Sequence, residues 1–436
     1  LWSSPQCPPS SCTALVRKQN WMPSATGWGC ELMLRSHKVR LRPNNVQARG
    51  LARAAGCARF AWNWGLAWWQ TEYARYKAGE RDQAPGQMEA RRILNSLKRE
   101  QFPWMVESTK CAPQEALINL GRAFGNFFAK RAKYPTFKKK GVRDSFRLSS
   151  GQFAVTENRL RVPNIGWITM SETPRFTGII KAVTISRRAG EWFAALTIET
   201  TEPEKLPATG RTVGVDVGVR EFATQHGVLS ETPRALRKAQ RRLKRAQQAL
   251  SRKQKGSANR AKARLKVAAI HAKVADTRGD WLHKVTTGLV EKYDAIAIED
   301  LNVRGMVRNR RLAKSVLEAG FGEFRRQLEY KTALAGRTLL VANRWFASSK
   351  TCSACDAKTK QRMSLDVREW RCEHCGTHHH RDINAATNLD KLNTPGVPWY
   401  QPVESSPPLL ASACADQQAA SVKQEPDSGT CVNKIA

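Results

Sequence analysis

Two pairs of cysteines place the tightest limit on how this 436-residue chain can fold. Cys352 and Cys355 form one CxxC pair, Cys372 and Cys375 form the other, and sixteen residues separate the two pairs. Each pair can present two thiolates on one edge of a tetrahedron, so the two pairs together predict a closed site for one Zn²⁺ ion. With four cysteine ligands no coordination position stays open. We therefore predict a structural zinc ribbon over residues 348–376, with the nearby His374, His378, His379 and His380 as exposed loop residues.

The charge balance indicates the class of partner. Lysine and arginine number 73 against 37 acidic residues, a formal net charge of +36. Such an excess repels itself and is usually tolerated because a polyanion neutralises it. The sequence contains no apolar run of about 18 residues that could cross a membrane. Nucleic acid is therefore the favoured partner, ahead of a membrane surface or an acidic protein, and the scattered remaining cysteines fit a reducing compartment.

The periodicity of apolar residues divides the chain into helical and stranded regions. Apolar positions over 51–73 and 117–127 predict two amphipathic helices, whose Trp62, Trp64, Trp68 and Trp69 are more often core residues than base-stacking ones. Hairpins are predicted over 153–162 and 180–198. The basic segment Lys130–Gly141 is either a solvated loop or an arm that contacts phosphates.

A basic helical hairpin is predicted over residues 233–273, with its turn at Gly256 and Ser257. Between Arg237 and Lys273 there are many lysines and arginines but no aspartate or glutamate. A charge run is usually a solvated face, but one of a single sign over this length would repel itself without a partner. The hairpin is therefore predicted to be a nucleic-acid-binding track.

Three acidic residues lie where a buried carboxylate would be costly unless it were paired or bound to metal. Asp216 interrupts the apolar strand VGVDV, Glu299 ends the strand AIAIE, and Asp382 opens an alanine-rich helical segment. A third strand is predicted at Arg337–Val341. Alone, each acid is more often a structural ion pair or a cap. Together they could hold two Mg²⁺ ions about 3.5–4 Å apart, which would activate water and stabilise the leaving oxygen of a phosphodiester.

These motifs also carry a family resemblance. The order GVDVGV, AIAIEDLNV, SSKTCSAC…CEHCG and RDINAATN resembles the TnpB family of insertion-sequence proteins, relatives of the type V CRISPR effectors. The match runs from about Met33 to Leu392. Asp356 stands where the first knuckle usually has glycine and His380 where an aspartate is common, but neither change touches the three acids. Asp300, next to Glu299, should face the opposite side of the strand.

The resemblance implies a multidomain α+β and α/β fold. A β-barrel wedge domain (33–50 and 131–208) would contain an inserted helical recognition domain (51–130). A RuvC-like nuclease domain of RNase H fold (209–347 and 377–392) would follow, interrupted by the zinc ribbon. Residues 1–32 are expected to be a disordered upstream extension, and residues 393–436 a disordered tail.

The resemblance also implies a function. Asp216, Glu299 and Asp382 would bind Mg²⁺ in an RNA-guided endonuclease that hydrolyses phosphodiester bonds in double-stranded DNA beside a short flanking motif. A guide RNA from the element's own end would be the second partner of a cytoplasmic monomer or homodimer, nucleoid-associated when bound to DNA.

Two alternatives stay open. One is a guide-dependent DNA-binding protein that no longer cuts, which the intact set of three acids argues against. The other is a transposase acting in strand transfer. It is disfavoured because the chain has no His-hydrophobe-His motif with a nucleophilic tyrosine.

Overall fold

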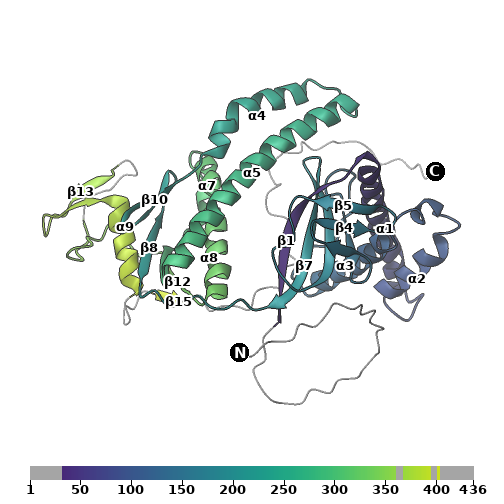
Figure 1. Ribbon diagram of the computed structural model, residues 1–436, viewed down its shortest axis with the longest axis horizontal. Coiled ribbons are helices and arrows are strands. Elements are labelled where there is room, and N and C mark those ends of the chain that lie inside the picture. The colour runs from purple at the N-terminus through teal and green to yellow at the C-terminus, as the bar shows by residue number, and fades with distance from the viewer. Residues whose placement is uncertain (1–31, 360–366, 394–399, 403–436) are drawn as a thin grey trace, which may run out of the picture. The chain divides into compact units, whose positions relative to one another are not determined.

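A computed structural model describes residues 32–359, 367–393 and 400–402 of the chain (Figure 1). The predicted disordered extension lies outside these residues except for Leu32. Most of the predicted tail also lies outside them. None of the helices in the described residues is long and apolar enough to cross a membrane.

The first sheet has seven strands, all joined by antiparallel pairings. Its strand order is β2-β6-β7-β1-β5-β4-β3. Within the described residues the two end strands, β2 and β3, are not paired with each other, so closure into a barrel stays a prediction. The strands are β1 (Leu32–Arg42), β2 (Ser145–Ser149), β3 (Ala154–Thr156), β4 (Arg159–Val162), β5 (Gly166–Met170), β6 (Ile179–Arg188) and β7 (Glu191–Thr201).

Both predicted hairpins are confirmed. Val155 of β3 lies opposite Leu160 of β4, and β6 pairs with β7 along most of its length. The turn between β6 and β7 consists of Ala189 and Gly190, both with positive φ (53° and 93°). Two consecutive residues with positive φ match the right-handed twist of the flanking strands, which explains the tight reversal at this point.

The helices that follow β1 pack against this sheet. They are α1 (Asn45–Lys77), α2 (Gln87–Leu97), the short η1 (Pro103–Met105) and α3 (Cys111–Phe128). α1 begins six residues before the predicted start because Asn44 and Gln47 form a reciprocal capping box. The side chains of Trp62 and Trp69 are buried in the core shared with the sheet, as predicted.

The second sheet has the order β10-β9-β8-β11-β12-β15. β8, β9 and β10 form an antiparallel meander, β11 and β12 run parallel to β8, and β15 pairs antiparallel with β12. The strands are β8 (Thr212–Val217), β9 (Glu221–Thr224), β10 (Gly227–Glu231), β11 (Ala295–Glu299), β12 (Thr338–Ala342) and β15 (Tyr400–Pro402). The strand β15 corrects the prediction that the whole chain after Asn393 is a disordered tail.

Alternate residues of the central strands face two different cores. Val213, Val215, Ile296 and Ile298 pack with α5 and α8 on one face. Ala297 and Leu340 pack with Leu389 of α9 on the other face. The helices and the remaining strands of this part are α4 (Ala235–Ser251), α5 (Ala258–Lys292), α6 (Val303–Arg308), α7 (Ala313–Ala319), α8 (Phe321–Ala335), β13 (Glu369–Arg371), β14 (His378–His380), α9 (Arg381–Asp390) and η2 (Lys391–Asn393).

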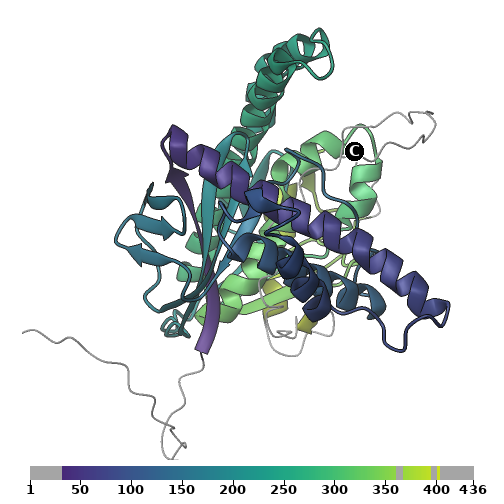
Figure 2. The ribbon, with the colours of Figure 1, turned by 90° about the vertical axis from the view of Figure 1, so that its right-hand side faces the viewer.

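The predicted basic helical hairpin is confirmed as α4 and α5, which lie side by side in both views (Figures 1 and 2). Ser257 caps α5 by accepting a hydrogen bond from the backbone N–H of Arg260. α5 continues to Lys292, well beyond the predicted end at residue 273, because the helix goes on to cover the second sheet with Leu282, Leu289 and Val290.

Candidate functional site

Asp216 and Glu299 lie at the same edge of the second sheet. The parallel register places Ile298 of β11 beside Val215 of β8, so the next residues are Glu299, which ends β11, and Asp216, the last residue but one of β8. Side chains at equal positions of adjacent strands project to the same face of a sheet. Both carboxylates therefore lie on the face that α9 covers.

Helix α9 brings Asp382 to this edge. A Cβ atom at Gly214 would overlap the carbonyl oxygen of Ala386, so the backbones of β8 and α9 are in direct contact. Asp382 precedes Ala386 by one helical turn, and Asp216 follows Gly214 by two strand residues. Because β8 runs toward the N-terminus of α9, the first turn of the helix lies over the end of the strand. The Asp382 residue is only 8% exposed.

The close packing at Gly214 gives a testable prediction. Gly214→Ala places a methyl group against the Ala386 carbonyl, which must move because backbone atoms cannot rotate away. Overpacking of this kind typically costs about 1–3 kcal/mol. We expect a lower melting temperature and a loss of metal-dependent activity, because α9 and Asp382 shift away from Asp216. Differential scanning calorimetry and a cleavage assay measure the two effects. Gly288→Ala, at an open position of α5, should change neither.

The charges of the other two carboxylates both act on Asp216. Burial raises the pKa of Asp216, and the charges of Glu299 and Asp382 raise it further, while the charge of Arg381 acts in the opposite direction. Burial also raises the pKa of Glu299. The Ser348 hydroxyl, which donates a hydrogen bond to the Glu299 carboxylate, and the charge of Arg381 both act to lower this pKa. Like charges that share a dry site disfavour one another's ionisation.

The three acids are not drawn together as tightly as ligands of a single ion. Among the described residues, the four cysteines form the group of His, Cys, Asp or Glu side chains whose ligand atoms are close enough to bind one ion, and the three acids do not form such a group. Asp382 is instead held by Arg368, whose Nη1 lies 3.0 and 2.7 Å from the two carboxylate oxygens.

The raised pKa of Asp216 predicts an unusual pH dependence. In the metal-free protein the ionised form of Asp216 destabilises the fold, so stability should be higher below the raised pKa and fall as the pH rises through it. At neutral pH in EDTA, Asp216→Asn should raise the melting temperature and flatten this part of the pH profile. Scanning calorimetry from acidic to neutral pH tests the prediction. An unchanged or lower melting temperature for Asp216→Asn would contradict it.

Asp300 is a structural residue, as its predicted orientation suggests. Its carboxylate oxygens accept hydrogen bonds from Arg325 and Arg344, each at 2.6 Å. Burial acts to raise the pKa of Asp300, but these two guanidinium groups outweigh it and hold the pKa below its usual range. Asp300 therefore belongs to an ion-pair network beside the three acids rather than to the acidic cluster itself.

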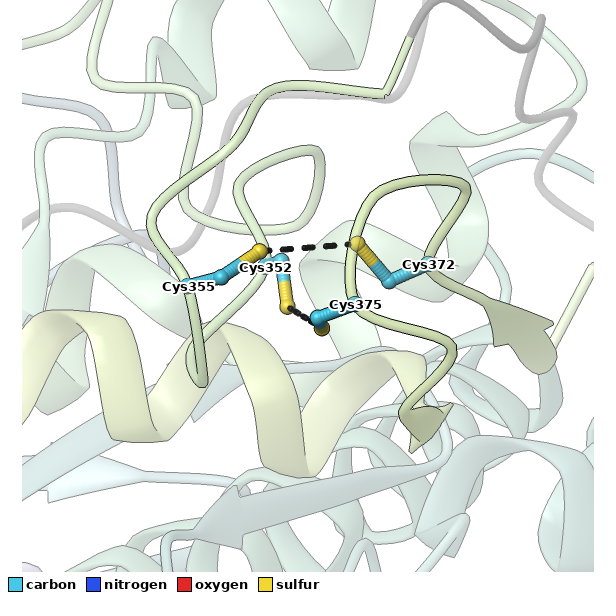
Figure 3. A group of neighbouring side chains, drawn as sticks. All are labelled: Cys352, Cys355, Cys372 and Cys375. Carbon is cyan, nitrogen blue, oxygen red and sulfur yellow. Dashed lines mark hydrogen bonds between the residues drawn. The ribbon is translucent and has the colours of Figure 1, made fainter.

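The four cysteines converge as the sequence predicts (Figure 3). The Sγ atoms of Cys352 and Cys375 are 3.6 Å apart, as are those of Cys355 and Cys372, and all four lie within 4.8 Å of one another. Thiolates about 2.3 Å from one ion at the corners of a tetrahedron lie about 3.8 Å apart. The donor set and its spacing therefore fit a four-coordinate Zn²⁺ ion.

Both knuckles share one backbone pattern. The backbone carbonyl of Cys352 accepts a hydrogen bond from the N–H of Asp356 at 2.9 Å, and the backbone carbonyl of Cys372 accepts one from the N–H of Gly376 at 3.0 Å. Asp356 and Gly376 both have a positive φ, 59° and 74°. This conformation favours glycine, and aspartate is among the residues that tolerate it. The departure at Asp356 therefore keeps the turn and both ligands of the first knuckle.

The histidine prediction is wrong for His379. His378 and His374 are exposed, but His379 is buried, its ring packs against Trp370, and its Nε2 lies 3.0 Å from the Cys352 Sγ. The His379 side chain points inward while that of His378 points outward, because successive side chains of a strand such as β14 face opposite sides. His379 therefore supports a thiolate from outside the set of four cysteines.

Two asparagines join the cysteine ribbon to α9. Asn384 accepts a hydrogen bond from the N–H of Ser353 at 2.8 Å and donates to the carbonyl of Thr351 at 2.8 Å. Asn388, one turn later, donates to the carbonyls of Ser348 and Thr351. Both asparagines are buried, so these bonds fix the ribbon to the helix that carries Asp382.

Three residues around the acids escaped sequence reasoning: Ser348, Arg368 and Arg381. Arg381 is adjacent to Asp382 in the sequence, which is a usable signal. Ser348 and Arg368 each lie four residues before a cysteine pair, and neither belongs to a periodic pattern. Their roles depend on how the ribbon docks, which only the fold reveals.

Comparisons with family models place most of the chain in one group of proteins. A family described as "Probable transposase" matches residues 195–310, "Cas12f1-like, TNB domain" matches residues 321–389, and "Helix-turn-helix domain" matches residues 33–78. Over the last range the structure has a strand followed by one continuous helix, α1.

Curated relatives match nearly the full length. A "Putative RNA-guided DNA endonuclease" of Streptomyces pristinaespiralis is 36% identical over 422 residues, covering 91% of this chain and 97% of the relative. InsQ of Escherichia coli K12, which carries the same description, is 33% identical and covers 86% and 96%. Among solved structures, the Cas12f1-sgRNA-target DNA complex matches with a TM-score of 0.50 at 14% identity, covering 78% of this chain and 81% of that one. This last likeness concerns the fold.

Proposed function

The chain belongs to the TnpB family of insertion-sequence proteins, and we propose that it is an RNA-guided DNA endonuclease that cuts with Asp216, Glu299 and Asp382. The observation that carries the proposal is that Asp216 and Glu299 lie on adjacent strands at one sheet edge, where the charges of Glu299 and Asp382 both raise the pKa of Asp216. Its partners would be a guide RNA from the element's own end and double-stranded target DNA, consistent with the net charge of +36.

The strand order supports a RuvC-like assignment. The antiparallel strands β10, β9 and β8, followed by the parallel β11 and β12, form the 3-2-1-4-5 arrangement of the RNase H fold that the family resemblance implies. The first and fourth strands of this arrangement carry Asp216 and Glu299.

The residues around the acids would prepare them for two Mg²⁺ ions. When bound, the two ions would activate water and stabilise the leaving oxygen. The Ser348 hydroxyl orients the Glu299 carboxylate, and Arg381 lowers the cost of ionising both Asp216 and Glu299. Arg368 neutralises Asp382 at 2.7 Å in the structure. With its side chain about half exposed, Arg368 would also be available to contact a phosphate.

The basic hairpin of α4 and α5 would bind the nucleic acid. Its lysines and arginines are exposed on both helices, while Leu243, Ala263 and Ile270 are buried between them. In the first domain, Lys130–Gly141 is fixed to α1 rather than free. Asn63 exchanges two hydrogen bonds with the backbone of Lys138, and the Lys138 ammonium lies 3.7 Å from the centre of the Trp62 ring. This fixed basic segment supports the phosphate-contacting role over that of a solvated loop.

The test uses the full chain purified with RNA transcribed from its own element. Duplex DNA carrying a target matched to the guide and a randomised flank is presented with Mg²⁺ or with EDTA, and the products are sequenced. Mg²⁺-dependent, guide-dependent cuts beside an enriched flank support the proposal. Guide-dependent binding without cuts would overturn it in favour of a DNA-binding protein, and joined donor and target ends would favour strand transfer.

A further inference from the structure

The two residues that flank the loop over residues 343–347 both contact Glu299. Ala342, the last residue of β12, is the register partner of Glu299. Ser348, directly after the loop, donates its hydroxyl hydrogen bond to the Glu299 carboxylate. Trp345 stands at the middle of this five-residue loop. Because Trp345 lies three positions along the chain from both Ala342 and Ser348, its Cα lies within about 11 Å of the Cα of each of these two neighbours of Glu299.

The loop is fixed on both sides of Trp345. The Asn343 side chain accepts a hydrogen bond from the backbone N–H of Trp345 at 3.0 Å, and the Asn343 carbonyl accepts one from Phe346 at 2.9 Å. Arg344 is bound to Asp300 at 2.6 Å. The Phe346 ring packs into the small core beneath α9. The position of Trp345 is therefore set by its neighbours.

Trp345 itself is 87% exposed, the highest value among the exposed large apolar residues in the described ranges. A single exposed apolar residue is ordinary on a protein surface. Trp345 differs because hydrogen bonds fix its backbone in a short loop whose two ends both contact Glu299, while its side chain stays in water. A presented aromatic ring next to a half-exposed arginine, here Arg344, has the chemistry that binds an unpaired nucleotide: a flat face for the base and a cation for the phosphate.

We propose that Trp345 stacks on an unpaired base of the DNA strand that occupies the site, on the order of three nucleotides or fewer from the scissile phosphate. The inference rests on the proposed nuclease function and adds a strand-positioning residue to it. A base can stack on an indole only when its face is free, so the contact selects a separated strand over a duplex. Stacking would also fix the direction in which the strand crosses the carboxylates.

A base-specific fluorescence experiment tests the contact without requiring cleavage. The full chain with its guide RNA, in an Asp216→Ala background, is bound to target DNA in which 2-aminopurine is walked through the displaced strand and the target strand. Stacking on an indole quenches 2-aminopurine. We expect quenching at one or two adjacent positions with Trp345 present, loss of that quenching in Trp345→Ala, and most of it retained in Trp345→Phe.

Cleavage kinetics in the otherwise unaltered protein provide the second readout. Base stacking is worth about 1–3 kcal/mol, so Trp345→Ala should lower kcat/KM by roughly 5- to 150-fold. The effect should fall mainly on KM, Trp345→Phe should recover most of the loss, and the melting temperature should stay unchanged. The matched control is Trp167→Ala, an exposed tryptophan of β5 (42% exposed) that is remote in sequence from the site.

The outcomes separate the two proposals. Equal quenching in the protein with Trp345 and in Trp345→Ala, or cleavage by Trp345→Ala within twofold of the unaltered protein, would overturn the stacking role and leave the nuclease proposal intact. Trp345-dependent quenching in a protein that fails to cut with Asp216 intact would support the stacking and overturn the nuclease function.

Discussion

Asp216→Ala is expected to lower Mg²⁺-dependent DNA cleavage by at least about 10³-fold, corresponding to roughly 4 kcal/mol of lost transition-state stabilisation. Burial raises the pKa of Asp216, and the charges of both other carboxylates raise it further, so Asp216 is the acid on which the other two act. Asp216→Ala therefore removes the carboxylate that interacts with both of the other acids. Guide-dependent DNA binding should persist, because the basic hairpin and the first domain are untouched.

Single-turnover cleavage and a binding assay, performed on the same preparations, measure the two quantities separately. Asp280→Ala is the matched control, because Asp280 is an exposed aspartate of the same part of the chain that pairs only with Lys284, one turn along α5. It should cut at the normal rate. Retention of more than a tenth of the activity in Asp216→Ala would contradict the proposed role of the acids.

Removal of one thiolate from the cysteine ribbon is expected to abolish zinc binding and cleavage together. Structural zinc sites contribute on the order of 10–16 kcal/mol of apparent binding free energy, far more than a small ribbon can replace by packing. In Cys352→Ser we expect the zinc content to fall to near zero. Hydrogen exchange should become fast over 352–359 and 367–380, where the two knuckles and their short strands lie.

Cleavage should fail because the ribbon shapes the acidic site. Ser348, four residues before the first cysteine pair, contacts Glu299, and Arg368, four residues before the second pair, contacts Asp382. The first knuckle is also bonded to Asn384 of α9. Cys111→Ala, which replaces a buried cysteine of α3 outside the ribbon, should keep its zinc and its activity. A zinc-free Cys352→Ser protein with full activity would show that the ribbon and the acidic site are independent.

Local patterns predicted much of this molecule. The CxxC spacing determines its own turn, so four thiolates could be placed without knowing the rest of the fold. The strands that carry Asp216 and Glu299 were evident because an acid inside an apolar run has few satisfactory environments. The helical hairpin followed from heptad spacing and the turn at Gly256 and Ser257.

The contacts that depend on docking could not be predicted in the same way. His379 is buried because β14 turns it toward Cys352, a consequence of three consecutive histidines in which the sequence does not distinguish one from another. Arg368 reaches Asp382 only after the ribbon has folded back beside α9. The edge strand β15 has no recognisable strand pattern because it is only three residues long and ends in a proline.

The separation of the acids along the chain has a consequence for synthesis. Asp216 and Glu299 leave the ribosome well before Asp382, which is carried by α9 after the cysteine ribbon. A nascent or prematurely terminated chain therefore has the basic hairpin and the first domain before it has a complete set of carboxylates. Under the proposed function, such a chain could bind nucleic acid but could not cut it, so cutting would become available only once almost the whole described region has been translated.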